Sequence, residues 1–193
     1  MISKNCDCCK VLCGNVDKCY QKILITLKGG WVLNHYGGSD TYLGRLVLET
    51  YSHIEDWESL NQYTHLKYLG GNLQTICKCL RRYWEKHTEY LDKIEQFNIA
   101  YLNESPFKNG YTTGKELTDR LHIHFHILPR TRRMRESLCD PEHILGWHLI
   151  DCISCFPEEY QLQNRNYLRA KRLMEYLSDC LSSIKVEETT KCK

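Results

Sequence analysis

The sequence has no run of roughly 20 apolar residues, the length that a helix needs to cross a bilayer. Its first residues, from Met1 to Cys9, lack the apolar stretch of a secretory signal peptide. The formal net charge is only +2, which is too small to require nucleic acid as a partner. No internal repeat or low-complexity tract is present. We therefore expect a cytoplasmic globular protein with no membrane anchor and no obligatory nucleic acid.

The composition suits a single domain with an extension. Hydrophobic residues make up 42% of the 193 residues and charged residues 26%, the balance of a soluble globular chain that can bury its own core. Beyond Pro129 the composition changes to a basic run that ends at Arg135. We therefore expect a domain over residues 1–130 and a partly helical C-terminal extension over residues 131–193.

Twelve cysteines are an unusually high number for such a chain. Five of them crowd the amino-terminal segment: Cys6, Cys8, Cys9, Cys13 and Cys19. Without an export signal, such a cluster is more typical of bound metal or free thiols than of disulfides. A second Cys-x-x-Cys pair, Cys152 and Cys155, is interpreted as buried free cysteine rather than as a second metal site.

Hydrophobic periodicity predicts an α+β fold, with an antiparallel sheet of about five strands, one long helix and one short helix. The predicted strands are Lys22–Lys28, Trp31–Tyr36, Leu43–Glu49, Phe97–Asn103 and Leu121–Leu128. A short helix is expected around Trp57–Leu66, and the long one after Asn72 as its N-cap. A further helix, from about Pro157 to Ile184, is expected in the extension.

The last predicted strand carries three alternating histidines. Because successive side chains of a strand point to opposite faces, His122, His124 and His126 share one face at a spacing of roughly 7 Å. Imidazole titrates near neutral pH, and it is a nucleophile when its other nitrogen is held by an acceptor. Three alternatives compete with a catalytic role: structural histidines, a His-x-His metal site, and an accidental histidine tract.

The segment from His122 to Leu128 reads His-φ-His-φ-His-φ-φ, where φ is apolar, and it resembles the signature of the histidine-triad family. Two upstream segments, Tyr42–His53 and Phe97–Glu104, resemble the family's glycine-containing strand and its asparagine-containing strand. The resemblance extends from about Cys6 to Arg130. It implies a histidine-triad fold for residues 1–130 and a homodimer that joins two sheets.

The resemblance also implies roles for individual residues. His124 is expected to attack the α-phosphate of a nucleotide, with His122 and His126 completing the catalytic set. Asn34 and Asn103 match positions that contact the nucleotide. Thr118 is a candidate hydroxyl donor to phosphate, although Leu117–Arg120 departs from the family's Gly-Gln-Ser/Thr segment.

The implied activity is a hydrolase of nucleotide phosphoanhydrides or phosphoramidates, with dinucleoside polyphosphates as substrates and a nucleotidyl-histidine intermediate. Two alternatives remain. One is a nucleotidyl transferase or phosphorylase of the same superfamily, which passes the nucleotidyl group to another acceptor. The other is a non-catalytic nucleotide-binding protein.

Some members of the family hold structural zinc with an amino-terminal Cys-x-x-Cys pair. Cys6 and Cys9 match that pair, and His53 and His122 match the histidines that complete the site. Two thiolates and two imidazoles form the closed tetrahedral set that structural zinc prefers. Cys8 complicates this ligand assignment, and free thiols are the alternative.

Overall fold

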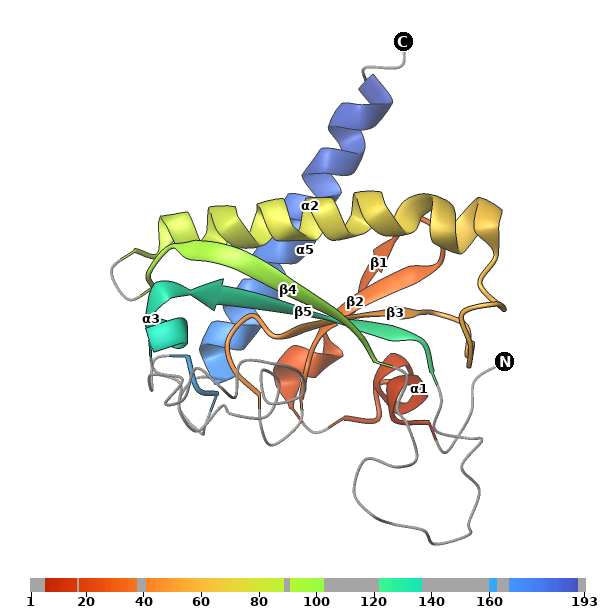
Figure 1. Ribbon diagram of the computed structural model, residues 1–193, viewed down its shortest axis with the longest axis horizontal. Coiled ribbons are helices and arrows are strands. Elements are labelled where there is room, and N and C mark those ends of the chain that lie inside the picture. Colours follow the sequence, from red (N-terminus) through yellow and green to blue (C-terminus); the bar gives the residue numbers. More distant parts are fainter. Residues whose placement is uncertain are drawn as a thin grey trace, which may run out of the picture.

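The computed structural model describes residues 6–16, 18–37, 41–88, 91–102, 122–136, 160–162 and 167–190. It confirms the α+β class: an open, antiparallel sheet of five strands in the order β1-β2-β3-β5-β4 lies between helices (Figure 1). The strands are β1 (Ile25–Leu27), β2 (Trp31–His35), β3 (Leu46–Thr50), β4 (Ile94–Leu102) and β5 (His124–Thr131). Among the described residues, no helix is both long and apolar enough to span a membrane.

The strand predicted over Lys22–Lys28 is shorter than expected. Its first residue ends a 3-10 helix, η1 (Cys19–Lys22), and only Ile25–Leu27 pair with β2. The turn between β1 and β2 contains Gly29 and Gly30, both at positive φ, a conformation that glycine adopts without steric cost. A Cβ at Gly29 would lie 2.5 Å from the carbonyl oxygen of Thr64. Any residue other than glycine at this position would therefore clash with the backbone at Thr64.

Strand register separates the two faces of the sheet. Val47 lies opposite His126, and Glu49 lies opposite His124, so these side chains share one face. The alternate residues of these strands, with their neighbours on β2, form the other face. They pack with helix α2 (Lys67–Lys86) in the hydrophobic core, and they include Trp31, Leu33, Leu46, Leu48 and Ile127. In Figure 1 α2 covers this core face, while α1 (Asp7–Leu12) lies on the opposite side of the sheet.

The start of the long helix differs from the prediction. A π-helical turn, η2 (Gln62–Leu66), runs directly into α2, and the side chain of Asn61 accepts hydrogen bonds from the backbone N–H groups of Tyr63 and Thr64. Asn72 lies inside α2, where its side-chain amide donates to the carbonyl of Lys28 at 2.9 Å. The predicted N-cap, Asn72, was therefore wrong. The cap is Asn61, eleven positions earlier, whose side chain satisfies free N–H groups in the first turn of η2. Of the short helix expected around Trp57–Leu66, only Gln62–Leu66 is helical, and it continues into α2; Trp57–Leu60 form bends and a turn.

Helix α5 (Tyr167–Thr190) begins later than the helix predicted from Pro157. It buries Ala170, Leu173, Met174 and Leu177 in the common core. Cys180 of α5 forms a disulfide with Cys79 of α2, across a sequence separation of 101. The C-terminal helix is thus joined to the long helix both by packing and by a covalent bond. A short helix, α3 (Arg132–Glu136), follows β5.

His35, at the end of β2, is a buried histidine without a predicted role. Its Nδ1 donates to the carbonyl of Tyr36 at 2.9 Å, and its Nε2 accepts from the backbone N–H of Gly44 at 3.2 Å. Burial lowers the pKa of His35 from 6.5 to about 4. The neutral His35 ring is thus favoured in the folded state, and protonation favours the unfolded chain. The contribution of His35 to the free energy of unfolding is complete above pH 6.5 and is lost as the pH falls toward 4.

The replacement His35→Gln is expected to make the free energy of unfolding less dependent on pH below 7, because glutamine offers a hydrogen-bond donor and an acceptor but does not titrate. Between pH 7 and pH 5, the wild-type protein should lose about 2 kcal/mol more unfolding free energy than the variant. Urea unfolding of both proteins at several pH values measures the difference. Parallel profiles would show that His35 does not cause the acid sensitivity.

Candidate active site and metal centre

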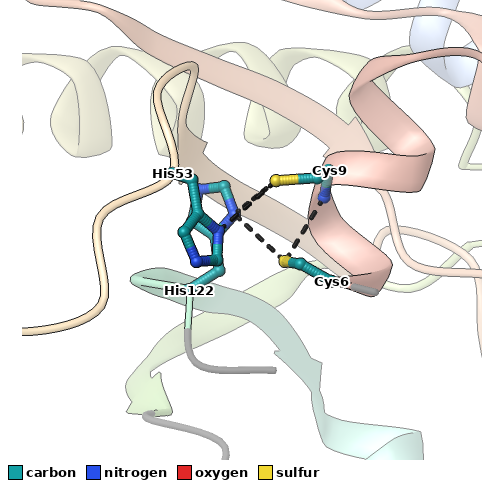
Figure 2. Close-up of side chains that lie close together, drawn as sticks. All are labelled: Cys6, Cys9, His53 and His122. Atoms are coloured by element: carbon teal, nitrogen blue, oxygen red, sulfur yellow. Dashed lines mark hydrogen bonds between the residues drawn. The ribbon is translucent and has the colours of Figure 1, made fainter. Parts of the chain in front are cut away.

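Two cysteines and two histidines meet at the amino-terminal end of α1. Cys6, Cys9, His53 and His122 each offer one ligand atom, and these four atoms lie within 4.8 Å of one another. Figure 2 shows the two cysteines on α1 facing the two imidazoles. The Sγ of Cys6 is 3.4 Å from Nδ1 of His122, and the Sγ of Cys9 is 3.4 Å from Nδ1 of His53 and 3.6 Å from Nδ1 of His122.

Helix α1 and the sheet place these residues. Cys6 is the N-cap of α1, and Cys9 follows in its first turn, so the two thiols lie on the same side of the helix. β3 and β5 run antiparallel with Glu49 opposite His124. The chain that leaves β3 toward His53 therefore lies beside the residue that enters β5, His122.

The geometry of this cluster fits zinc. With Zn–S near 2.3 Å and Zn–N near 2.0 Å, a tetrahedral site has S···N edges of about 3.5 Å, which matches the three sulfur–nitrogen distances. Each imidazole also uses its second nitrogen as ligating histidines do. The Nε2 of His122 donates to the carbonyl of Thr50 at 2.8 Å, and the Nε2 of His53 lies 3.1 Å from a carboxylate oxygen of Glu55.

The electrostatics favour the ligating forms. A hydrogen bond from the Cys8 thiol, aided by His122, lowers the pKa of Cys6 to about 3 against the opposing effect of burial. The same interaction raises the pKa of Cys8 well above its usual value. The lowered pKa favours the thiolate form of Cys6, which is the form that binds a cation.

A cavity of about 210 Å³ lies beside this cluster, on the histidine face of the sheet. His124 and His126 line it, together with Asn34, Tyr36, Glu49 and Cys8. The rings of His124 and His126 are 5.1 Å apart. The side chain of His122 instead turns to the cysteines, so the three histidines that the sequence places on one face divide between two neighbouring groups.

The tautomer of His124 follows from its backbone contact. Its Nδ1 lies 2.8 Å from the carbonyl oxygen of His122, and a carbonyl oxygen can only accept a hydrogen bond. The proton is therefore on Nδ1, which leaves the lone pair on Nε2. An imidazole whose second nitrogen is held in this way is a competent nucleophile or base.

Glu49 is a cavity residue that the sequence analysis missed. It is 1% exposed, and one carboxylate oxygen, Oε1, accepts from the side-chain amide of Asn34 at 2.5 Å. The other, Oε2, has no hydrogen-bond partner among the described residues. Burial raises the pKa of this carboxyl group to about 7. The sequence did contain a sign of this role. Side chains two positions apart on a strand share a face, so Glu49 lies on the same face as Val47, which is opposite His126.

Other predicted residues lie outside the part of the chain that the structure describes. Asn103 and Thr118, the remaining candidates for nucleotide contact, are among them, with the whole of Leu117–Arg120. The same holds for Cys152 and Cys155. Asn34 is the one predicted nucleotide contact that can be placed, and it lines the cavity that His124 also lines.

No protein-family model matches the sequence, and no curated protein matches it. The resemblance to the histidine-triad family therefore rests on the residues themselves. The clearest of these are the alternating histidines and the Cys-x-x-Cys pair that the fold brings beside them.

Proposed function

We propose that the protein is a nucleotide hydrolase of the histidine-triad type, with a histidine-triad fold and dinucleoside polyphosphates or related nucleotide conjugates as substrates. The observation that supports this most directly is the contact between Nδ1 of His124 and the carbonyl of His122. It fixes the lone pair on Nε2 in a residue that lines a cavity large enough to admit a phosphoryl group.

The reaction would take place in two displacements. In the first, Nε2 of His124 forms a bond to the α-phosphorus while the bond from that phosphorus to the leaving group breaks; a leaving oxygen departs as a phosphate anion, and a leaving nitrogen takes up a proton from solvent. In the second, water attacks the phosphorus and gives up a proton to solvent, the P–N bond breaks, and the imidazole is released with its lone pair restored. His126 lies beside the attacking ring and would donate a hydrogen bond to the phosphoryl oxygen as charge develops.

Zinc in the cluster of Cys6, Cys9, His53 and His122 would be structural in this proposal. Cys6, Cys9, His53 and His122 would supply all four ligands of a tetrahedral ion, which would leave no position for substrate. Zinc would join α1 to the start of β5 and thereby fix the strand that carries His124. The same helix contributes Cys8 to the cavity.

One observation bears on the hydrolase and equally on the alternative of a non-catalytic nucleotide-binding protein. The buried carboxyl of Glu49 is the cross-strand neighbour of His124, and an ionised carboxylate there would repel a phosphate. Its raised pKa, to about 7, keeps much of the carboxyl neutral near physiological pH and reduces this repulsion. The alternative predicts nucleotide binding with no turnover.

The experiment that tests the proposal is a turnover assay of purified protein on diadenosine tri- and tetraphosphate, a nucleoside phosphoramidate and an ADP-sugar, with and without inorganic phosphate. A radioactive adduct should appear on the protein when the reaction with substrate labelled at the α-phosphate is stopped by denaturant at alkaline pH, because the P–N bond of a nucleotidyl-histidine survives alkali and hydrolyses in acid. Turnover that depends on phosphate would assign a phosphorylase instead. Tight binding without turnover on every substrate would contradict the enzyme and favour the binding protein.

We also propose a homodimer in the cytoplasm. β4 is an edge strand, since among the described strands it pairs with β5 alone, and an open edge can extend a sheet into a second copy. The side chains of Ile99 and Tyr101 on this strand are exposed. Light scattering coupled to gel filtration should give twice the chain mass; a monomer at micromolar concentration would contradict the dimer.

A further inference from the structure

The side chain of Arg45 lies behind the cavity, next to the third histidine. Arg45 immediately precedes β3, and it is 1% exposed. Its Nε lies 3.5 Å from Nδ1 of His126. It is not among the residues that line the cavity, so it contacts the ring of His126 without itself lining the cavity.

An aromatic ring holds the guanidinium in this place. The Cζ of Arg45 lies 3.8 Å from the ring centroid of Tyr36, which is within the range of a cation–π interaction. The ring of Tyr36 packs in turn edge-on against the ring of His126, with 5.2 Å between their centroids. The backbone N–H of Tyr36 also donates to the carbonyl of Arg45 at 2.9 Å. The three side chains thus pack as one group, and the polar contact within that group is between Arg45 and His126.

This contact determines which nitrogen of His126 carries the proton. Arginine offers N–H donors only and stays protonated at every pH at which a protein folds. The nitrogen that faces it, Nδ1 of His126, must therefore accept, and the ring proton is on Nε2. The neighbouring ring has the opposite arrangement, because Nδ1 of His124 donates to a backbone carbonyl.

From these contacts we propose that Arg45 is a positioning residue for phosphoryl transfer, which keeps His126 as the Nε2–H tautomer so that this N–H donates to a phosphoryl oxygen of the ligand. The inference rests on the proposed function for its role in turnover. The tautomer itself is a property of the protein alone. The two cavity histidines are then a complementary pair, in which His124 offers a lone pair and His126 offers a proton.

The first test needs no substrate. The ring carbons and nitrogens of histidine are labelled, and the NMR signals of His126 are assigned by their absence in the His126→Gln variant. The wild-type protein should show the Nε2–H tautomer. In Arg45→Met, which keeps an unbranched stem but has no donor, the signals should move toward a mixture of the two tautomers. An Nδ1–H tautomer in the wild-type protein overturns the proposal, whether or not the variant folds.

Arg130 provides the matched control. It is also buried, at 3% exposure, and its guanidinium also lies over a tyrosine ring, that of Tyr42, at 5.8 Å. Arg130→Met should therefore remove a comparable buried cation–aromatic contact while leaving the His126 signals where they are. Equal movement of those signals in both variants would show a general structural effect and overturn the specific role of Arg45.

The second test uses turnover. Arg45→Met should lower kcat by a factor on the order of 10 to 100, the usual effect of removing a residue that orients a functional group, with KM within about twofold. A variant that folds, shifts the tautomer and keeps full kcat overturns the role of Arg45 in turnover while the hydrolase stands. If the wild-type protein turns over none of the substrates but shows the Nε2–H tautomer that Arg45→Met disturbs, the hydrolase fails and the positioning contact stands.

Discussion

Replacing His124 with alanine is expected to abolish turnover while leaving the fold and nucleotide binding largely intact. Removal of a nucleophile that forms a covalent intermediate costs about 10⁴-fold or more in kcat. The ring of His124 lies at the cavity surface on the face opposite the core, so its loss opens no hole in the core. The measurement is kcat of both proteins on the best substrate, with binding of a non-hydrolysable analogue and the melting temperature recorded beside it.

His87→Ala is the matched control for this result. His87 caps the carboxyl end of α2, and its ring packs on Tyr83, 4.4 Å between centroids, far from the cavity. This variant should keep wild-type kcat even where its stability falls. The covalent adduct trapped by alkaline denaturant should be absent from His124→Ala and present in His87→Ala. An adduct that persists in His124→Ala would place the nucleophile on another residue.

The second large effect concerns the cysteine–histidine cluster. Purified protein should contain one equivalent of zinc, and its removal by a chelator should lower the melting temperature by roughly 10 °C or more, because structural zinc contributes several kcal/mol or more to folding. The reason is geometric: the ion would hold α1, the loop after β3 and the start of β5 together. Calorimetry with and without chelator, paired with elemental analysis, measures both quantities.

Cys9→Ser and Cys13→Ser form a matched pair for this prediction. Cys9 is buried in the cluster, whereas Cys13 is exposed at the end of the same helix. Cys9→Ser should bind well below one equivalent of metal and should melt at the temperature of the chelated protein. Cys13→Ser should behave like the wild type. Full zinc occupancy in a Cys6→Ser, Cys9→Ser double variant would contradict this ligand set and leave free thiols as the better description.

The sheet was largely predictable because its signals are local. Alternation of His124 and His126 with apolar residues correctly gives the side chains of β5 that share a face, and the antiparallel sheet of five strands is confirmed. The start of α2 was less accessible, because both Asn61 and Asn72 are good caps by residue type. The choice between them depends on the turn that precedes the helix, which periodicity does not reveal.

The site was predictable in its residues more than in its arrangement. The turn of His122 toward the cysteines depends on where α1 packs, which is a tertiary contact between residues more than a hundred positions apart. Arg45 and Tyr36 act through a stack that no spacing rule describes. The Cys79–Cys180 disulfide is likewise invisible in the sequence, because spacing alone does not give the connectivity of twelve cysteines.

That disulfide makes a closed ring of the chain between α2 and α5. The ring contains β4, β5 and the residue that enters β5, His122, and so it holds all three of the alternating histidines. A protease that cut once within it would produce a two-chain molecule whose parts stay covalently linked. Such a nicked protein should migrate as one band in a denaturing gel without reductant and as two bands with it. Hydrolysis of one peptide bond between Cys79 and His122 would thus leave Cys6, Cys9 and His53 on one polypeptide and His122 and His124 on the other, within the same molecule.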